Sequence, residues 1–384
     1  MGNGDAEISI GERQKVALNE QIDRISSLPD PILAHILSLL PTEDAVKTVL
    51  IQRFGNLWTC IHNLDFDVCL YHECTEVDYE DTVDEERLIN FIRHVLILHQ
   101  RFDIHRFCLK LELNLWLTPG QLELANEIDT WIRFALRKKV KVLELDFKAC
   151  GNSGPKGYHK LPNDVVISDH LTELKLTMIE ILSGCPALES LFLYECYGLH
   201  KLDFTSVKLK NVVIELDCHD SSKLEVSCPY VASLNISGIE CMDLYNVSSI
   251  VDAALEFDNR FFDCARGQYR EVKMLFEQLY DAEVFTLFTR AILVFTIWAL
   301  IRSPCPAMNW RRLVLKTMLT KWHFPGIASL LRNSPDLEML DIHIQPGTKP
   351  FCVHDDRWLM EYEIDGENFW DLQRSSFHCL RSHL

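Results

Sequence analysis

The sequence predicts an α/β protein in which a small N-terminal helical unit precedes a solenoid, with a parallel sheet on the inner face of an arc. Three observations support this fold class. Proline-punctuated apolar segments at helical spacing occupy residues 21–70. From about residue 104 the pattern changes to short runs in which apolar and polar residues alternate. Similar runs then recur along the chain, and none of them could bury its apolar face alone.

The helical unit of residues 21–70 is predicted to contain two or three short helices. Pro31 suits the first turn of a helix, and Asp30 before it can cap free amides. Pro41 ends this helix, and Thr42 begins the next one. A unit of fewer than about 50 residues is too small to bury so many large side chains. Either the rest of the chain covers them, as in an ordinary core, or a partner does.

The segments on either side of this unit are polar. Residues 1–20 are predicted to be a flexible tail. Residues 71–103 combine an acidic loop with a linker helix, which the apolar spacing places between Arg87 and His99.

Residues 104–345 carry the repeated pattern. Phe107, Leu109, Leu111 and Leu113 alternate as in a strand, and residues 131–136 look helical. A Leu-x-x-Leu-x-Leu theme then recurs at Leu171/Leu174/Leu176, Leu188/Leu191/Leu193, Leu199/Leu202/Phe204, Leu209/Val212/Ile214, Val231/Leu234/Ile236, Trp310/Leu313/Leu315 and Leu337/Leu340/Ile342. The spacing of about 11 to 30 residues centres on that of leucine-rich repeats. Each unit is expected to contribute one strand to the inner sheet of the arc.

Two segments allow other interpretations. An open α/β fold could use the same strands, but no phosphate-binding loop follows any of them, and glycine-rich residues 151–157 are predicted to be a loop without Walker spacing. The most apolar window, Val284 to Ile301, is at the lower limit of a membrane span and contains Arg290. We expect two buried repeat strands joined by a turn there, and no membrane association.

The charge and cysteine content restrict the setting and the partners. The net charge is −18, from 38 basic and 56 acidic residues, which argues against nucleic acid as a partner. The 14 cysteines include no Cys-x-x-Cys pair, and the N-terminus lacks a signal pattern. We therefore expect an intracellular protein of the cytoplasm, the nucleus or both.

The sequence offers little catalytic chemistry. Cys69, His72 and Cys74, with Cys60 and His62 upstream, are the best metal-ligand candidates, but they lack the paired turns typical of a zinc site. No nucleophile elbow, paired-helix histidine motif or kinase signature is present. The expectation is a protein that is not an enzyme, with no metal and no cofactor.

The helical unit resembles an F-box of the plant F-box/leucine-rich-repeat family. The similarity lies in residues 23–30, Ile32-Leu33, residues 36–42 and Asn56-Leu57-Trp58, where prolines, apolar positions and the closing Leu-Trp are in register. The resemblance implies that the unit docks onto a Skp-type adaptor, and through it a cullin, while the repeats bind an unknown target protein for ubiquitin transfer. It also implies a set of adaptor-binding residues: Leu28, Pro29, Ile32, Leu33, Ile36, Leu37, Leu40, Pro41, Leu50, Phe54, Leu57 and Trp58.

The resemblance extends along most of the chain. Residues 131–136, 182–191 and 315–338 are similar to repeats of the same family. Residues 368–370 and 376–380 are similar to the opening of the FBD segment that often follows such repeats. Residues 346–384 are therefore expected to be a partial, truncated FBD-like segment.

One run departs from the family pattern. Relatives usually carry Ser-Val-Leu-Ser-Lys-Arg-Trp-Arg before Asn-Leu-Trp, whereas residues 49–55 here are one residue shorter, with Phe54 and Gly55 in place of tryptophan and arginine. A deletion inside a helix rotates the residues beyond it by about 100°. The alternative hypothesis is therefore a repeat-only interaction scaffold with a degenerate F-box and no ligase role.

Overall fold

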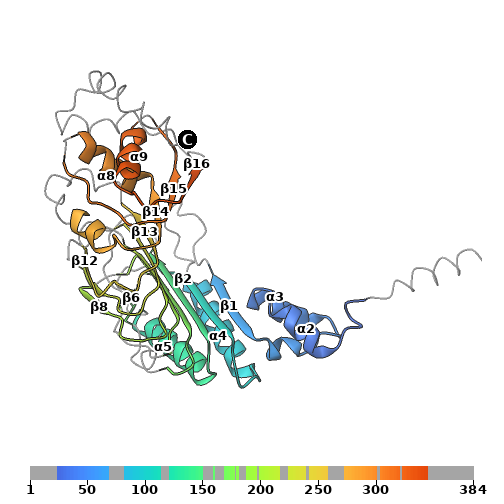
Figure 1. Ribbon diagram of the computed structural model, residues 1–384. Coiled ribbons are helices and arrows are strands. Elements are labelled where there is room, and N and C mark those ends of the chain that lie inside the picture. The colour runs from blue at the N-terminus through green and yellow to red at the C-terminus, as the bar shows by residue number, and fades with distance from the viewer. Residues whose placement is uncertain are drawn as a thin grey trace, which may run out of the picture.

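The computed structural model describes residues 24–68, 82–113, 121–149, 159–160, 168–177, 179–180, 187–196, 199–216, 224–238, 242–257, 272–300, 303–320 and 322–344. These residues form a curved stack of parallel strands with a small helical unit at one end (Figure 1). The predicted fold class is confirmed: an α/β solenoid follows a helical unit. The predicted tail (1–20), acidic run, glycine-rich loop (151–157) and FBD-like segment (346–384) lie outside the described residues, except that residues 82–86 are helical.

The main sheet has eleven strands in the order β1-β2-β3-β5-β7-β9-β11-β13-β14-β15-β16 and lines the inner side of the curve (Figure 1). All its neighbouring pairs are parallel. Its strands are β1 (Asn63–Val68), β2 (Arg106–Leu113), β3 (Val142–Ala149), β5 (Glu173–Thr177), β7 (Ser190–Tyr194), β9 (Asn211–Glu215), β11 (Ser233–Ser237), β13 (Asp252–Glu256), β14 (Val284–Phe288), β15 (Arg312–Thr317) and β16 (Met339–Ile344).

Two rows of apolar side chains hold this sheet to the layer behind it. Because successive side chains of a strand point to opposite faces, every second residue points to the covered face. The pairing register aligns these residues from strand to strand. The first row is Leu64, Phe107, Leu143, Leu174, Leu191, Val212, Leu234, Ala253, Phe285, Leu313 and Leu340. Of these only Leu340, on the last strand, is exposed.

The layer behind the sheet has two kinds of connection. Helices connect the strands at the two ends of the arc: α4 (Thr82–Leu98), α5 (Gln121–Arg137), α8 (Thr289–Leu300) and α9 (His323–Arg332). In the middle, the connections contain the short strands β8 (Lys201–Asp203), β10 (Leu224–Ser227) and β12 (Met242–Tyr245), which pair as a second parallel sheet. A further two-stranded sheet joins β4 (His159–Lys160) and β6 (Ile179–Glu180). A short strand needs fewer residues than a helix, which explains the irregular repeat spacing.

The structure corrects two assignments, one within the repeats and one at the end of the helical unit. The unit Leu199/Leu202/Phe204 was expected to supply an inner strand, but Leu202 lies in β8 of the outer sheet. Its leucine spacing is the same as that of the inner strands, so the pattern alone could not separate the two layers. Residues 63–68, included in the predicted helical unit, form β1, the first strand of the main sheet.

The apolar window from Val284 to Ile301 was expected to contain two strands. It contains β14 followed directly by α8, so this prediction was wrong. Helix α8 is buried on nearly all sides, between the sheet and α9, and a helix without a polar face gives no 3.6-residue periodicity. Its aromatic residues pack around Phe276, whose ring centroid lies 4.7 Å from that of Phe295. In the part of the chain that is described, no helix has both the length and the apolar character needed to cross a membrane.

A glycine lets α8 and α9 pack closely. A Cβ built on Gly326 would collide with the backbone oxygen of Ile292 and come within 2.6 Å of Thr296 Oγ1. The Thr296 hydroxyl donates to Trp322 O (2.7 Å) and accepts the amide of Gly326 (3.0 Å). The two helices therefore approach at backbone distance, with one buried hydroxyl satisfying groups of the second helix.

Gly326→Ala should force α8 and α9 apart. Overpacking a close contact typically lowers stability by about 1–3 kcal/mol, and here the clash is with backbone, which cannot rotate away. Urea unfolding of the variant measures the loss. Arg332→Ala, on the exposed side of α9, is the control and should change stability little; equal stability of both variants would show that the contact is not tight.

Candidate functional site

The helical unit at the start of the solenoid comprises helices α2 (Asp30–Leu37) and α3 (Thr42–Lys47). Two 3₁₀ turns follow, η1 (Thr48–Leu50) and η2 (Leu57–Cys60). Pro31 lies in the first turn of α2 and α3 begins at Thr42, as predicted. Two details differ: the N-cap of α2 is Pro29, so Asp30 is the first helical residue and its side chain makes no capping bond, and α2 ends at Leu37, before Pro41. Leu33, Leu37 and Trp58 are buried within the chain and form the core of this unit. Helix α2 therefore uses one apolar face for its own core and leaves the adjacent face uncovered.

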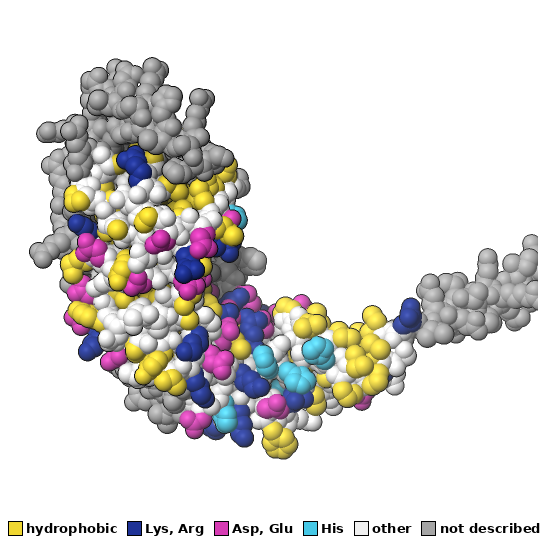
Figure 2. All heavy atoms as spheres, in the orientation of Figure 1, with side chains coloured by type: hydrophobic (Ala, Val, Ile, Leu, Met, Phe, Trp, Pro, Cys, Tyr) yellow, Lys and Arg dark blue, Asp and Glu magenta, His cyan; other side chains and the backbone are white. Residues whose placement is uncertain are grey.

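Exposed apolar side chains are concentrated on this unit. Of the 22 large hydrophobic side chains that are exposed in the described residues, eight lie between residues 25 and 51. We call these eight the apolar patch: Ile25, Ile32, Ile36, Leu39, Leu40, Val49, Leu50 and Ile51. Leu50 is the most exposed, at 88%. Figure 2 shows hydrophobic side chains gathered over this end of the molecule. A concentration of exposed apolar side chains of this kind is typical of an interaction surface.

The twelve residues that the resemblance implied for adaptor binding differ in their exposure. Pro29, Ile32, Ile36, Leu40, Pro41 and Leu50 are exposed. Leu28, Phe54 and Leu57 are partly buried. Leu33, Leu37 and Trp58 are buried in the core of the unit, so they are not on the surface that a partner could contact.

Four members of the apolar patch were not among the predicted residues: Ile25, Leu39, Val49 and Ile51. Three of these are sequence neighbours of residues that were predicted. The apolar run Val49-Leu50-Ile51 was a usable signal, because three consecutive apolar residues cannot all point into one core.

The shortened run of residues 49–55 does not continue an α-helix. A turn over residues 51–56 joins η1 to η2, and Gly55 has a φ of +40°, a conformation that favours glycine. The expected rotation of a helix beyond the deletion therefore does not arise. Arg53, in the same run, donates to Ser26 O and Leu28 O, each at 2.8 Å. Its guanidinium also pairs with Asp30 at 2.8 Å, which fixes the segment leading into α2.

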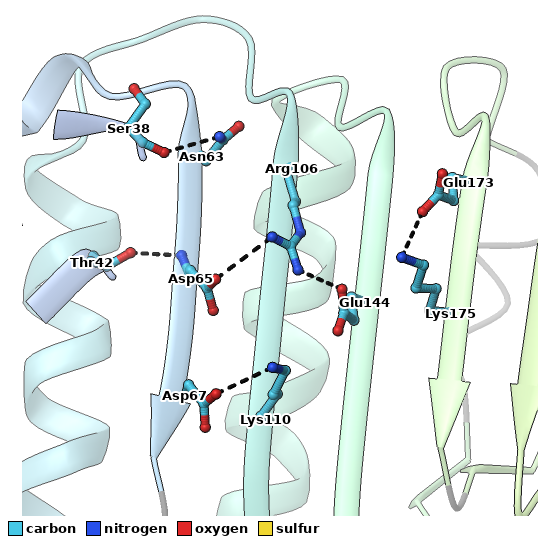
Figure 3. A network of polar contacts seen from close by, with 10 residues as sticks. All are labelled: Ser38, Thr42, Asn63, Asp65, Asp67, Arg106, Lys110, Glu144, Glu173 and Lys175. Carbon is cyan, nitrogen blue, oxygen red and sulfur yellow. Dashed lines mark hydrogen bonds and ion pairs between the residues drawn. The ribbon is translucent and has the colours of Figure 1, made fainter. Parts of the chain in front are cut away.

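The helical unit is attached to the edge of the main sheet by side-chain hydrogen bonds (Figure 3). Among the described strands β1 is the terminal one, so one of its backbone edges has no described strand beside it. The Thr42 hydroxyl accepts the amide of Asp65 (2.7 Å), and the Ser38 hydroxyl accepts the amide of His62 (2.8 Å). Asn63 Nδ2 donates to Ser38 O at 3.0 Å. The first two bonds satisfy the backbone amides of Asp65 on this edge and of His62 just before the strand, and an unpaired edge amide could otherwise pair with another chain.

Two histidines at this junction are held in the neutral form. Burial lowers the pKa of His62, and the positive charge of Arg101 lowers it further. Burial also lowers the pKa of His99, whose Nε2 lies 3.0 Å from Ile61 O, in position to donate. Both pKa values fall below the ordinary value near 6.5, so neither ring is charged at neutral pH.

The inner face of the first strands carries a compensated charge network (Figure 3). Arg106 on β2 pairs with Glu144 on β3 (2.6 Å) and with Asp65 on β1 (3.7 Å). Further along, Lys110 pairs with Asp67 at 3.2 Å. These pairs cross from strand to strand on the face that no described helix or strand covers.

Among the described residues, no three potential ligands lie close enough to hold a metal ion. Cys69, His72 and Cys74 lie outside the described residues, and Cys60 carries a free thiol.

A parallel solenoid with leucine-rich units, preceded by a proline-punctuated helical unit, defines the class of leucine-rich-repeat proteins with an N-terminal helical unit. The chain is 30% identical over 356 residues to "Putative F-box protein At1g49610" of Arabidopsis thaliana, covering 84% of this chain and 85% of the relative. It is 28% identical to F-box/LRR-repeat protein At5g02910 of Arabidopsis thaliana (93% of this chain, 80% of the relative). It is likewise 28% identical to F-box/LRR-repeat protein At3g03360 of that species (94% and 78%). The chain therefore belongs to the plant F-box/LRR-repeat family.

No family model matches the chain, and no solved structure matches it.

Thr42→Val tests the junction between the helical unit and β1. Valine keeps the shape of threonine but cannot accept the amide of Asp65, and a buried amide left unpaired costs about 1–3 kcal/mol. We expect lower stability in urea unfolding and faster hydrogen exchange at the Asp65 amide.

The matched control is Thr48→Val. The Thr48 hydroxyl donates only to Ala45 O within its own turn (2.6 Å), so this change should leave the Asp65 amide protected. Unchanged exchange at Asp65 in the Thr42 variant would contradict the proposed role of this bond.

Proposed function

We propose that this protein is the substrate-recognition subunit of a cullin-based, SCF-type ubiquitin ligase inside the cell. In this proposal the F-box unit docks a Skp-type adaptor through the apolar patch, and the repeat arc binds the target. The protein itself performs no chemistry. It holds the target near the ubiquitin carrier and so raises the effective concentration of the reacting groups.

The apolar patch is the single observation that carries this proposal. Ile32 and Ile36 are four residues apart and lie on one face of α2, while Val49, Leu50 and Ile51 supply a second group beyond α3. Burial of each large aliphatic side chain against a partner contributes roughly 1.5–3 kcal/mol. Several such side chains on one small unit provide enough apolar area for a stable protein interface.

The attachment of the unit also fits the role of a receptor. The hydrogen bonds to β1 and the buried core of α2 fix the unit to the end of the arc. An adaptor bound to the apolar patch would therefore have a defined orientation relative to a target bound on the repeats. Fixed geometry of this kind is what transfer by proximity requires.

Ile36→Asp and Leu50→Asp should each weaken adaptor binding by about 10–100-fold, because each removes one apolar contact and places a charge in the interface. Titration of the full chain with a purified Skp-type adaptor measures the change. The control is Val207→Asp, which introduces the same charge at an exposed valine on the repeats.

Leu33→Asp would be a poor test, since Leu33 is fully buried and its replacement should unfold the unit. Adaptor binding that survives both Ile36→Asp and Leu50→Asp would exclude the apolar patch as the docking surface. Absence of binding by the unmodified chain would instead favour the scaffold with a degenerate F-box.

A further inference from the structure

The uncovered inner face of the main sheet has paired charges towards both ends. At the N-terminal end, Arg106 and Lys110 neutralise carboxylates of neighbouring strands, and Lys175 pairs with Glu173 at 3.0 Å. At the C-terminal end, Arg312 pairs with Asp341 at 2.7 Å. Arg106, Lys110, Lys175 and Arg312 are therefore each matched by a carboxylate.

The middle of the same face differs. We call the uncovered face of β7, β9, β11 and β13 the central strip. The register places Glu215 of β9, Ser237 of β11 and Glu256 of β13 in one row across the strands. The central strip also carries Asp252 but no lysine or arginine. Within the described residues, neither Glu215 nor Glu256 forms an ion pair.

An apolar row runs beside these carboxylates, two residues earlier in each strand. The register aligns Phe192, Val213 and Ala254 across the central strip, with Asn235 between the last two. On β14 and β15 the same register positions are Thr286 and Val314, which are buried, so the accessible part of the row ends at β13. A chain lying across the strands would meet an apolar row on one side and carboxylates on the other.

The environment of Glu256 indicates that its charge is incompletely compensated. Burial raises the pKa of Glu256 above its ordinary value, and the like charge of Glu215 raises it too, although Arg290 and Lys316 oppose this shift. In the described residues neither cation forms an ion pair with Glu256. Arg290 donates to Phe257 O (3.3 Å), and the Lys316 ammonium lies 5.2 Å from the ring centroid of Phe288.

We propose that the central strip binds the target protein through a segment in which a lysine or arginine lies next to an apolar side chain. The basic group would pair with Glu215 or Glu256, whose strands are separated by β11 and lie about 10 Å apart, and the apolar group would pack on Phe192 and Val213. Charge complementarity selects this occupant, because an acidic segment would meet unpaired carboxylates and a wholly apolar one would leave them desolvated. The inference names the class of target for the receptor role proposed above and rests on that role.

The test uses the full-length chain and a displayed library of random peptides, selected at near-physiological salt so that long-range attraction to the net negative charge is screened. We expect enriched peptides to carry lysine or arginine beside a large apolar residue. The best peptide is then synthesised, and its affinity is measured by fluorescence anisotropy for the wild type and for the double variant Glu215→Gln, Glu256→Gln. The double variant should bind at least about tenfold more weakly.

The control is Glu225→Gln, the same substitution on β10 of the outer sheet, which should leave the affinity unchanged. Four results would overturn the inference. These are no enriched peptide, enrichment of acidic or uncharged peptides, equal affinity for the wild type and the double variant, and equal loss in the double variant and the control. The last would mean attraction to the overall charge.

Adaptor titration of the same double variant separates this inference from the receptor role. The double variant should bind the adaptor as the wild type does, since the central strip lies on the repeats and the apolar patch on the helical unit. If peptides bind as expected but the adaptor does not, the target site stands and the ligase role fails. If instead the adaptor binds but no basic peptide does, the ligase role stands and the inferred class of target is wrong.

Discussion

The Thr42 hydroxyl accepts the Asp65 amide on the free edge of β1, the Ser38 hydroxyl accepts the His62 amide just before this strand, and these contacts join the helical unit to the arc. A parallel sheet that ends in an uncovered strand exposes unpaired amides, which could template pairing with another chain. Here the same bonds that protect the edge also fix the helical unit in place. Because Leu37 and the first strand share one continuous core, the attachment is apolar as well as polar.

Much of the repeat body follows from the sequence, because apolar residues two apart identify a strand wherever one face is buried. The pattern fails where an outer strand has the same spacing as the inner ones, and where an element lacks large core residues or a polar face. Leu202 has the same spacing as the inner strands although it lies in the outer sheet. Strand β13 offers only Ala253 and Leu255 to the core and was missed. Helix α8 has no polar side, so neither of the two common periods could reveal it.

The candidate site was predictable in position but not in orientation. Ile32, Leu33, Ile36 and Leu37 form two apolar pairs at four-residue spacing, and the pairs lie about 100° apart around the helix. The sequence does not distinguish which pair faces inwards, because that depends on where Trp58 and β1 come to lie. The structure places Leu33 and Leu37 inside and Ile32 and Ile36 outside. Likewise, pairing of charges across strands depends on register, which no local pattern contains.

Strand β16, the last strand described, is more exposed than the other strands of the main sheet. Both faces of β16 are largely exposed, and Leu340 and Ile342 occupy core positions without the cover that their counterparts have. In a linear stack each unit is held mainly by its neighbours. Unfolding of the described arc should accordingly begin at β16 and proceed towards β1.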